Sequence, residues 1–87
     1  MKKGYLISKA IEEHLELKRR ILNQMLIPTI EPKTVQYFCR TLQYRDDLAM
    51  ASALLEFEVE KKAKVIGYKK IHREDGTPID MAIYEAA

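Results

Sequence analysis

The spacing of apolar residues changes once along the chain, near residue 63. Before that point apolar side chains recur every three or four positions, which is the spacing of amphipathic helices. After it, segment 65–71 is rich in β-forming residues and segment 79–84 alternates between more and less apolar ones. Asp75-Gly76 between these segments is a typical turn signal. The sequence therefore predicts helices followed by a C-terminal β-hairpin.

We expect one side of this hairpin to be buried. Ile79, Met81 and Ile83 occupy alternate positions of the second predicted strand, so they share one side of it. A two-stranded hairpin is marginally stable by itself. The apolar side of the hairpin should therefore lie on the helices.

The first predicted helix covers residues 5–26. Its apolar stripe comprises Ile7, Ile11, Leu15, Leu22 and Leu26, widened by Ala10, Leu17 and Ile21. The helix should end near Leu26 or Ile27, because Pro28 disfavours helical geometry in the residue before it. Residues 27–30 are then expected to form a short extended connector.

The next helix can begin with Pro32 in its first turn or with Thr34 as its N-cap. Its apolar positions are Val35, Phe38, Cys39 and Leu42. The charged stretch 43–47 is expected to break the helix, with Asp46 or Asp47 capping a third one. It contains neither glycine nor proline, so a single long helix over residues 34–62 remains an alternative.

The segment after this break is apolar on more than one side. Leu48, Ala51, Leu55 and Val59 form one stripe, and Met50, Leu54 and Phe57 form a second. Such a helix either sits centrally in the fold or presents an apolar face to a partner. Met50, Leu54 and Phe57 are the candidate protein interface.

Length and composition predict a single domain over residues 1–87, of the α+β class and mainly α. A lone cysteine cannot close an internal disulfide and is typical of a reducing compartment. No apolar run is long enough to span a membrane, and the first residues lack a signal-peptide pattern. We therefore expect a cytoplasmic protein with no membrane partner.

The sequence shows no catalytic or metal-binding signature. A nucleophilic Cys39 would need a nearby base, and His14 and His72 are both distant from it in sequence. One cysteine and two separated histidines give no recognisable metal-ligand spacing. We expect a non-enzymatic protein that uses no cofactor and no small-molecule substrate.

The order of predicted elements resembles that of the winged helix–turn–helix superfamily. TVQYFCRTLQY is similar to the first helix and turn of the motif, LAMASALLEFE to its second helix, and KVIGYKKI with IDMAIY to the strands of its wing. The resemblance implies a winged-helix-like fold that binds DNA through the second helix and the wing. Two features depart from it: Gln43 stands where the turn usually has glycine, and the second helix begins with Asp46 and Asp47 instead of basic residues.

The sequence is therefore consistent with two candidate functions. The first is a regulatory or protein-interaction module that forms a homodimer or engages a protein partner through its apolar helix. The second is a dimeric protein that binds DNA or another nucleic acid through phosphate contacts. Its candidate contact residues are Lys18, Arg19 and Arg20 in the first helix and Lys69, Lys70 and Arg73 in the hairpin. The two acidic residues at the start of the third helix argue against base reading there.

Overall fold

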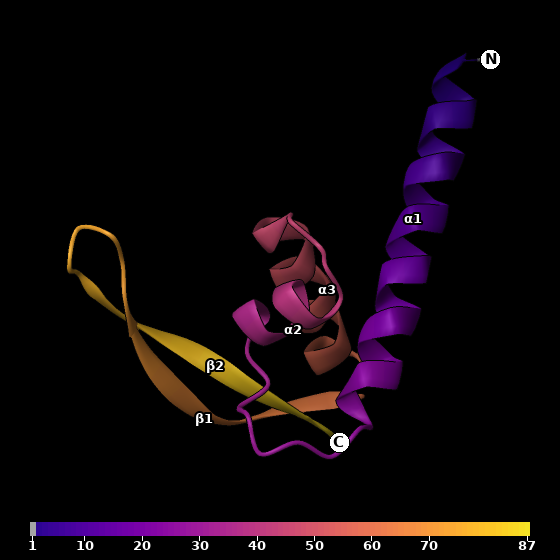
Figure 1. Cartoon of the computed structure of the whole chain (residues 1–87). Helices are drawn as coiled ribbons and strands as arrows, with labels where there is room; N and C mark the ends of the chain where they lie inside the picture. Colours follow the sequence, from indigo (N-terminus) through magenta and orange to yellow (C-terminus); the bar gives the residue numbers. More distant parts are fainter. Residues whose placement is uncertain (1) are drawn as a thin grey trace.

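The structure, a computed structural model, describes residues 2–87, with side chains described from Ile7 onward. Three helices precede an antiparallel hairpin (Figure 1): α1 (Lys2–Met25), α2 (Val35–Thr41), α3 (Asp47–Val59), β1 (Ala63–His72) and β2 (Pro78–Ala86). The predicted α+β fold, mainly α, with a C-terminal hairpin is confirmed. Residues 34–62 form two helices, so the single long helix is excluded.

Side-chain caps fix where α2 and α3 begin. Thr34 caps α2 by accepting a hydrogen bond from the backbone N–H of Tyr37 at 3.2 Å, so Pro32 lies outside the helix and not in its first turn. Asp46, and not Asp47, caps α3 by accepting from the N–H of Ala49 at 3.0 Å. Each cap satisfies an amide that has no partner within its own helix.

Both short helices end in a left-handed residue. Gln43 follows α2 with φ of 53°, and Lys61 follows α3 with φ of 62°. The next amide in each case bonds back into the last turn, from Tyr44 N to Cys39 O at 2.8 Å and from Lys62 N to Phe57 O at 2.9 Å. This is the Schellman arrangement, which usually has glycine at the left-handed position. Gln43 therefore occupies the turn position where the resemblance places glycine.

The core lies where the three helices meet the root of the hairpin. Its members are Leu17, Ile21, Met25, Phe38, Leu42, Met50, Ala53, Leu54, Phe57, Ala63 and Tyr84. Phe38, Ile21, Met50 and Leu54 are fully enclosed. Because α3 supplies four of these residues and contacts α1, α2 and β1, it is the central element of the fold.

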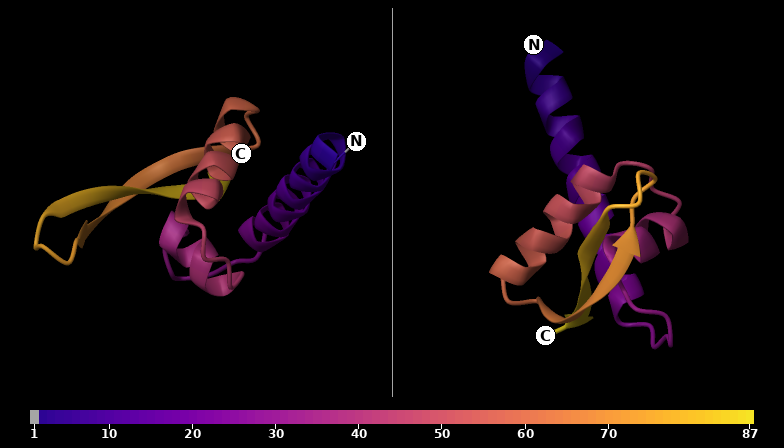
Figure 2. Two further views of the ribbon diagram at one scale, coloured as in Figure 1. Left: turned by 90° about the horizontal axis from the view of Figure 1, so that it is seen from above. Right: turned by 90° about the vertical axis from the view of Figure 1, so that its left-hand side faces the viewer.

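The predicted stripe on α1 is wrong for its N-terminal half. Ile7, Ile11, Leu15 and Leu26 are each more than half exposed. Of the predicted stripe, Leu17 and Ile21 are buried in the core, and Met25, which was not predicted, joins them. The N-terminal half of α1 extends beyond α2 and α3 (Figure 1; Figure 2, right), so no other element of the chain lies there to cover it. Periodicity predicted the helix, but the positions of α2 and α3 decide which part of it is buried.

The prediction for the buried side of the hairpin is also wrong. Tyr84 is buried, and Ala82 and Ala86 pack against the core beside it, so this side of β2 faces the helices. Ile79, Met81 and Ile83 alternate with these residues and therefore lie on the opposite side, half-buried.

The connector between α1 and α2 is fixed by Lys33. Its ammonium group donates to the carbonyl oxygens of Met25 at 2.7 Å and Ile27 at 2.6 Å, which caps the end of α1. Its own carbonyl oxygen accepts from the N–H of Tyr84 at 2.9 Å. Lys33 thus ties the end of α1, the connector and β2 together.

Candidate functional site

The two apolar stripes of α3 have opposite environments. Met50 and Leu54 are completely buried and Phe57 is 3% exposed, so the prediction that these three residues form a protein interface is wrong. The other stripe points to solvent. Its large residues are Leu48, Leu55 and Val59, with exposed fractions of 81%, 57% and 74%, and we call them the α3 outer stripe.

The geometry of α3 aligns these three side chains. Leu48 and Leu55 are seven residues apart and Val59 follows four later, so all three project along one line of the helix. That line runs opposite the core face, because α3 packs on the rest of the chain through Met50, Leu54 and their neighbours. Leu48, Leu55 and Val59 therefore form an apolar line on the surface, with Ser52 between the first two.

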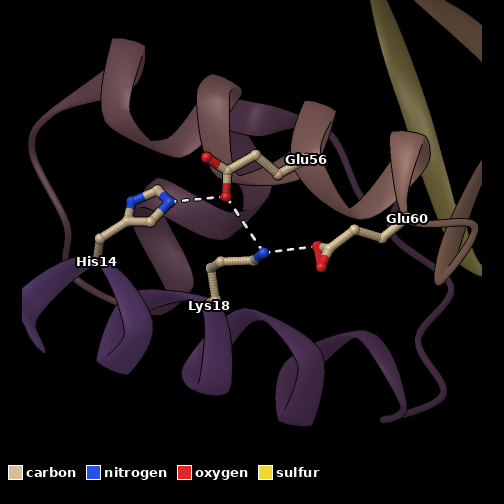
Figure 3. A network of polar contacts seen from close by, with 4 residues as sticks. All are labelled: His14, Lys18, Glu56 and Glu60. Carbon is tan, nitrogen blue, oxygen red and sulfur yellow. Dashed lines mark hydrogen bonds and ion pairs between the residues drawn. The ribbon is translucent and has the colours of Figure 1, made fainter. Parts of the chain in front are cut away.

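A polar network joins α1 to the edge of α3 beside this stripe (Figure 3). His14 Nε2 lies 2.8 Å from Glu56 Oε2, and Lys18 Nζ lies 3.2 Å from the same oxygen. Lys18 Nζ also donates to Glu60 Oε1 at 2.6 Å and stands 4.8 Å from the centre of the Phe57 ring. Four contacts from one turn of α1 hold α3 in position.

The charges in this network stabilise one another. The hydrogen bond from His14, followed by that from Lys18, lowers the pKa of Glu56. The hydrogen bond to Glu60 is the main cause that raises the pKa of Lys18. Lys18 and Glu56 therefore remain an ion pair at neutral pH, and the network positions α3.

The predicted basic cluster of α1 is not available as one surface. Lys18 is engaged with α3, Arg19 with Glu16 at 3.0 Å, and Arg20 Nη2 with the Leu42 carbonyl oxygen at 2.6 Å. The three side chains turn to three different partners, and their contact with phosphates stays a prediction.

The predicted basic residues of the hairpin lie toward its turn, with Lys69 and Lys70 in β1 and Arg73 directly after it. Lys69, Lys70 and Arg73 are all exposed. In the strand register Lys70 is directly opposite Asp80, whereas Lys69 is opposite Met81. The proposed contact of these residues with phosphates stays a prediction.

Cys39 has the features of a structural thiol. Burial, reinforced by the neighbouring Asp47, raises the pKa of Cys39 to about 11. Its Sγ lies 3.4 Å from Asp47 Oδ1. A thiol held in its neutral form is a poor nucleophile at neutral pH. In the part of the chain with described side chains, no three histidine, cysteine or acidic residues are grouped as a metal site would require.

Comparison of the chain with protein-family models, with curated proteins and with solved structures returned no match. Within residues 2–87, no helix combines the length and apolar character needed to cross a membrane. The function must therefore be inferred from the surface of the chain itself.

The sequence contained one signal that distinguishes the two stripes of α3. Ser52 lies on the line of the outer stripe, four residues after Leu48 and three before Leu55, and it is exposed. The buried face, in contrast, is formed by Met50, Ala53, Leu54 and Phe57, without a polar residue. A serine within an apolar stripe is more easily accommodated at a surface than in a core.

Proposed function

We propose that this chain is a small cytoplasmic, non-enzymatic regulatory or protein-interaction module on a winged-helix-like scaffold, and that it self-associates through the α3 outer stripe. One observation carries the proposal. Leu48, Leu55 and Val59 are between 57% and 81% exposed and aligned on a helix whose opposite face is the core. Single exposed apolar residues are ordinary, but an aligned group is typical of an interface.

The energetics support this use of α3. Covering a leucine or valine side chain contributes about 1.5–3 kcal/mol, so three of them supply a substantial part of a specific association. The helix is already fixed by its caps, by the core and by the polar network with α1. Docking on a rigid helix costs little conformational entropy.

Sedimentation velocity over a range of protein concentrations tests the proposal, comparing the unmodified chain with Leu55→Glu. We expect the unmodified chain to form dimers and the variant to remain monomeric, because the glutamate would have to be buried without a partner. Leu26→Glu is the matched control, since Leu26 is 64% exposed at the end of α1 and away from the stripe. A chain that stays monomeric at every concentration would contradict self-association.

A second function is supported by one further observation. β1 carries Lys64, Lys69 and Lys70, all exposed, and no acidic residue. Such a strand can bind phosphates without reading sequence. Fluorescence anisotropy with a random-sequence duplex tests this function. Binding should weaken steeply as salt rises and should be reduced by Lys69→Glu, whereas an absence of binding at low salt would refute it.

A further inference from the structure

The side of the hairpin that faces away from the core is apolar and half-buried, and its inner end, at Ile83, lies beside the connector residues 28–33. Ile79, Met81 and Ile83 lie on this side, and the strand register places Ile71 opposite Ile79 and Gly67 opposite Ile83. Beyond its root the hairpin extends away from the three helices, as Figure 1 and the left view of Figure 2 show. We call Ile71, Ile79, Met81 and Ile83 the outer face of the hairpin.

The outer face carries a net positive charge. Lys69 and Lys64 share the face, since they pair with Met81 and Glu85, and Glu85 is the acidic residue on it. Lys70 pairs with Asp80 on the opposite side of the hairpin. The α3 outer stripe has the opposite character. α3 carries Asp47, Glu56 and Glu58 without a basic residue, and Glu58 flanks the stripe beside Val59. The chain thus has one apolar surface with a net positive charge and one flanked by acidic residues.

These two surfaces cannot meet within one molecule. α3 contacts its own β1 through the buried face that contains Phe57, so its outer stripe points away from its own hairpin. Like surfaces are also poor partners for each other. Two α3 helices would bring acidic residues together, and two hairpins would bring lysines together.

We propose that, in a dimer of this chain, the outer face of the hairpin of one copy packs on the α3 outer stripe of the second copy. The contact is reciprocal, so a two-fold axis makes both contacts at once and closes the dimer. Lys69 of one copy then faces Glu58 of the other. This inference rests on the proposed self-association and specifies which surfaces meet.

Disulfide trapping in a Cys39→Ser background tests the arrangement. Met81→Cys and Leu55→Cys are prepared separately, mixed and oxidised under mild conditions. We expect a covalent dimer in the mixture and little from either variant alone. Cross-linking of Leu55→Cys to itself would instead establish a contact between α3 helices, and cross-linking of Met81→Cys to itself a contact between hairpins; either result overturns the inference.

A charge exchange gives a second test that needs no cysteine. Lys69→Glu and Glu58→Lys should each weaken the homodimer by about tenfold or more, because each places like charges at both contacts. In the mixed dimer one contact has the exchanged pair and the other the original pair, so mixing should restore association. Unchanged homodimers, or no recovery on mixing, overturn the inference.

The two proposals fail in different ways. An unmodified chain that is monomeric by sedimentation refutes self-association and, with it, the contact between hairpin and α3. A stable dimer in which the mixed cysteine variants do not cross-link refutes only the contact.

Discussion

Leu54 and Leu55 are neighbours in the sequence, yet the first side chain is completely buried and the second is 57% exposed. The helical turn of α3 directs Leu54 into the core and Leu55 to the surface. Comparing the effect of the same substitution at the two positions therefore distinguishes the buried face of α3 from its exposed face.

Truncation of these two leucines should have different effects on stability. Leu54→Ala should lower the free energy of unfolding by about 2–5 kcal/mol, because it leaves a cavity in the core. Leu55→Ala should change it by only about 0.5 kcal/mol in the monomer. Urea denaturation at low protein concentration measures both. Equal losses would contradict the placement of the two faces.

Replacement of Gln43 by glycine should stabilise the fold. Gln43 adopts φ of 53° after α2, a conformation that is unfavourable for residues with a Cβ atom. Relief of about 1–2 kcal/mol of left-handed strain, less about 0.5–1 kcal/mol of extra chain entropy for glycine, should raise the free energy of unfolding of Gln43→Gly by roughly 0.5–1 kcal/mol. Gln36→Gly, at an exposed position within α2, is the control and should be destabilising. The midpoint of thermal unfolding, relative to the unmodified chain, should rise for Gln43→Gly and fall for Gln36→Gly.

Acid should weaken the link between α1 and α3 through Glu56. The pKa of Glu56 is lowered from 4.5 in the folded chain, mainly by its hydrogen bond with His14. A depressed carboxyl pKa contributes stability above the unfolded value, and this stability is lost as the pH falls through the folded value.

Glu56→Gln tests this dependence. The variant should be less stable than the unmodified chain at neutral pH, and the difference should shrink as the pH drops below about 4.5. Urea titrations across this range measure it, with Glu74→Gln in the hairpin turn as the control. A difference that stays constant with pH would contradict the role of the Glu56 carboxylate.

Cys39 should react slowly in the folded chain. Its pKa is raised from 9.0 to about 11, chiefly by burial, so at a pH below both values the folded thiolate fraction is about 100-fold smaller than the unfolded one. Alkylation rates measured at pH 8 with and without denaturant check this. Asp47→Asn should accelerate the reaction of the folded chain, because it removes a carboxylate that disfavours the thiolate. Equal alkylation rates in the folded and unfolded chain would refute the prediction that Cys39 is a buried thiol with a raised pKa.

Local signals in the sequence were sufficient for the first helix, for the hairpin and for most of the ends of the elements, although they left open whether residues 34–62 form one helix or two. Pro28 predicted the end of α1, the Asp75-Gly76 pair predicted the hairpin turn, and the structure places Gly76 there with φ of 86°. Thr34 and Asp46 were both among the predicted caps. These features depend on a few neighbouring residues, so periodicity and capping chemistry determine them.

The burial of each apolar surface was decided by the tertiary structure. Ile7 and Ile21 lie on the same helix and are equally apolar, but Ile21 is buried in the core with residues of α2 and α3, whereas Ile7 is 61% exposed. Met50, Leu54 and Phe57 were predicted as an interface and are core, whereas Leu48, Leu55 and Val59 are exposed. Periodicity determines that a helix or strand has an apolar side. Which side is covered depends on contacts between segments distant in sequence, and only the folded chain brings those segments together.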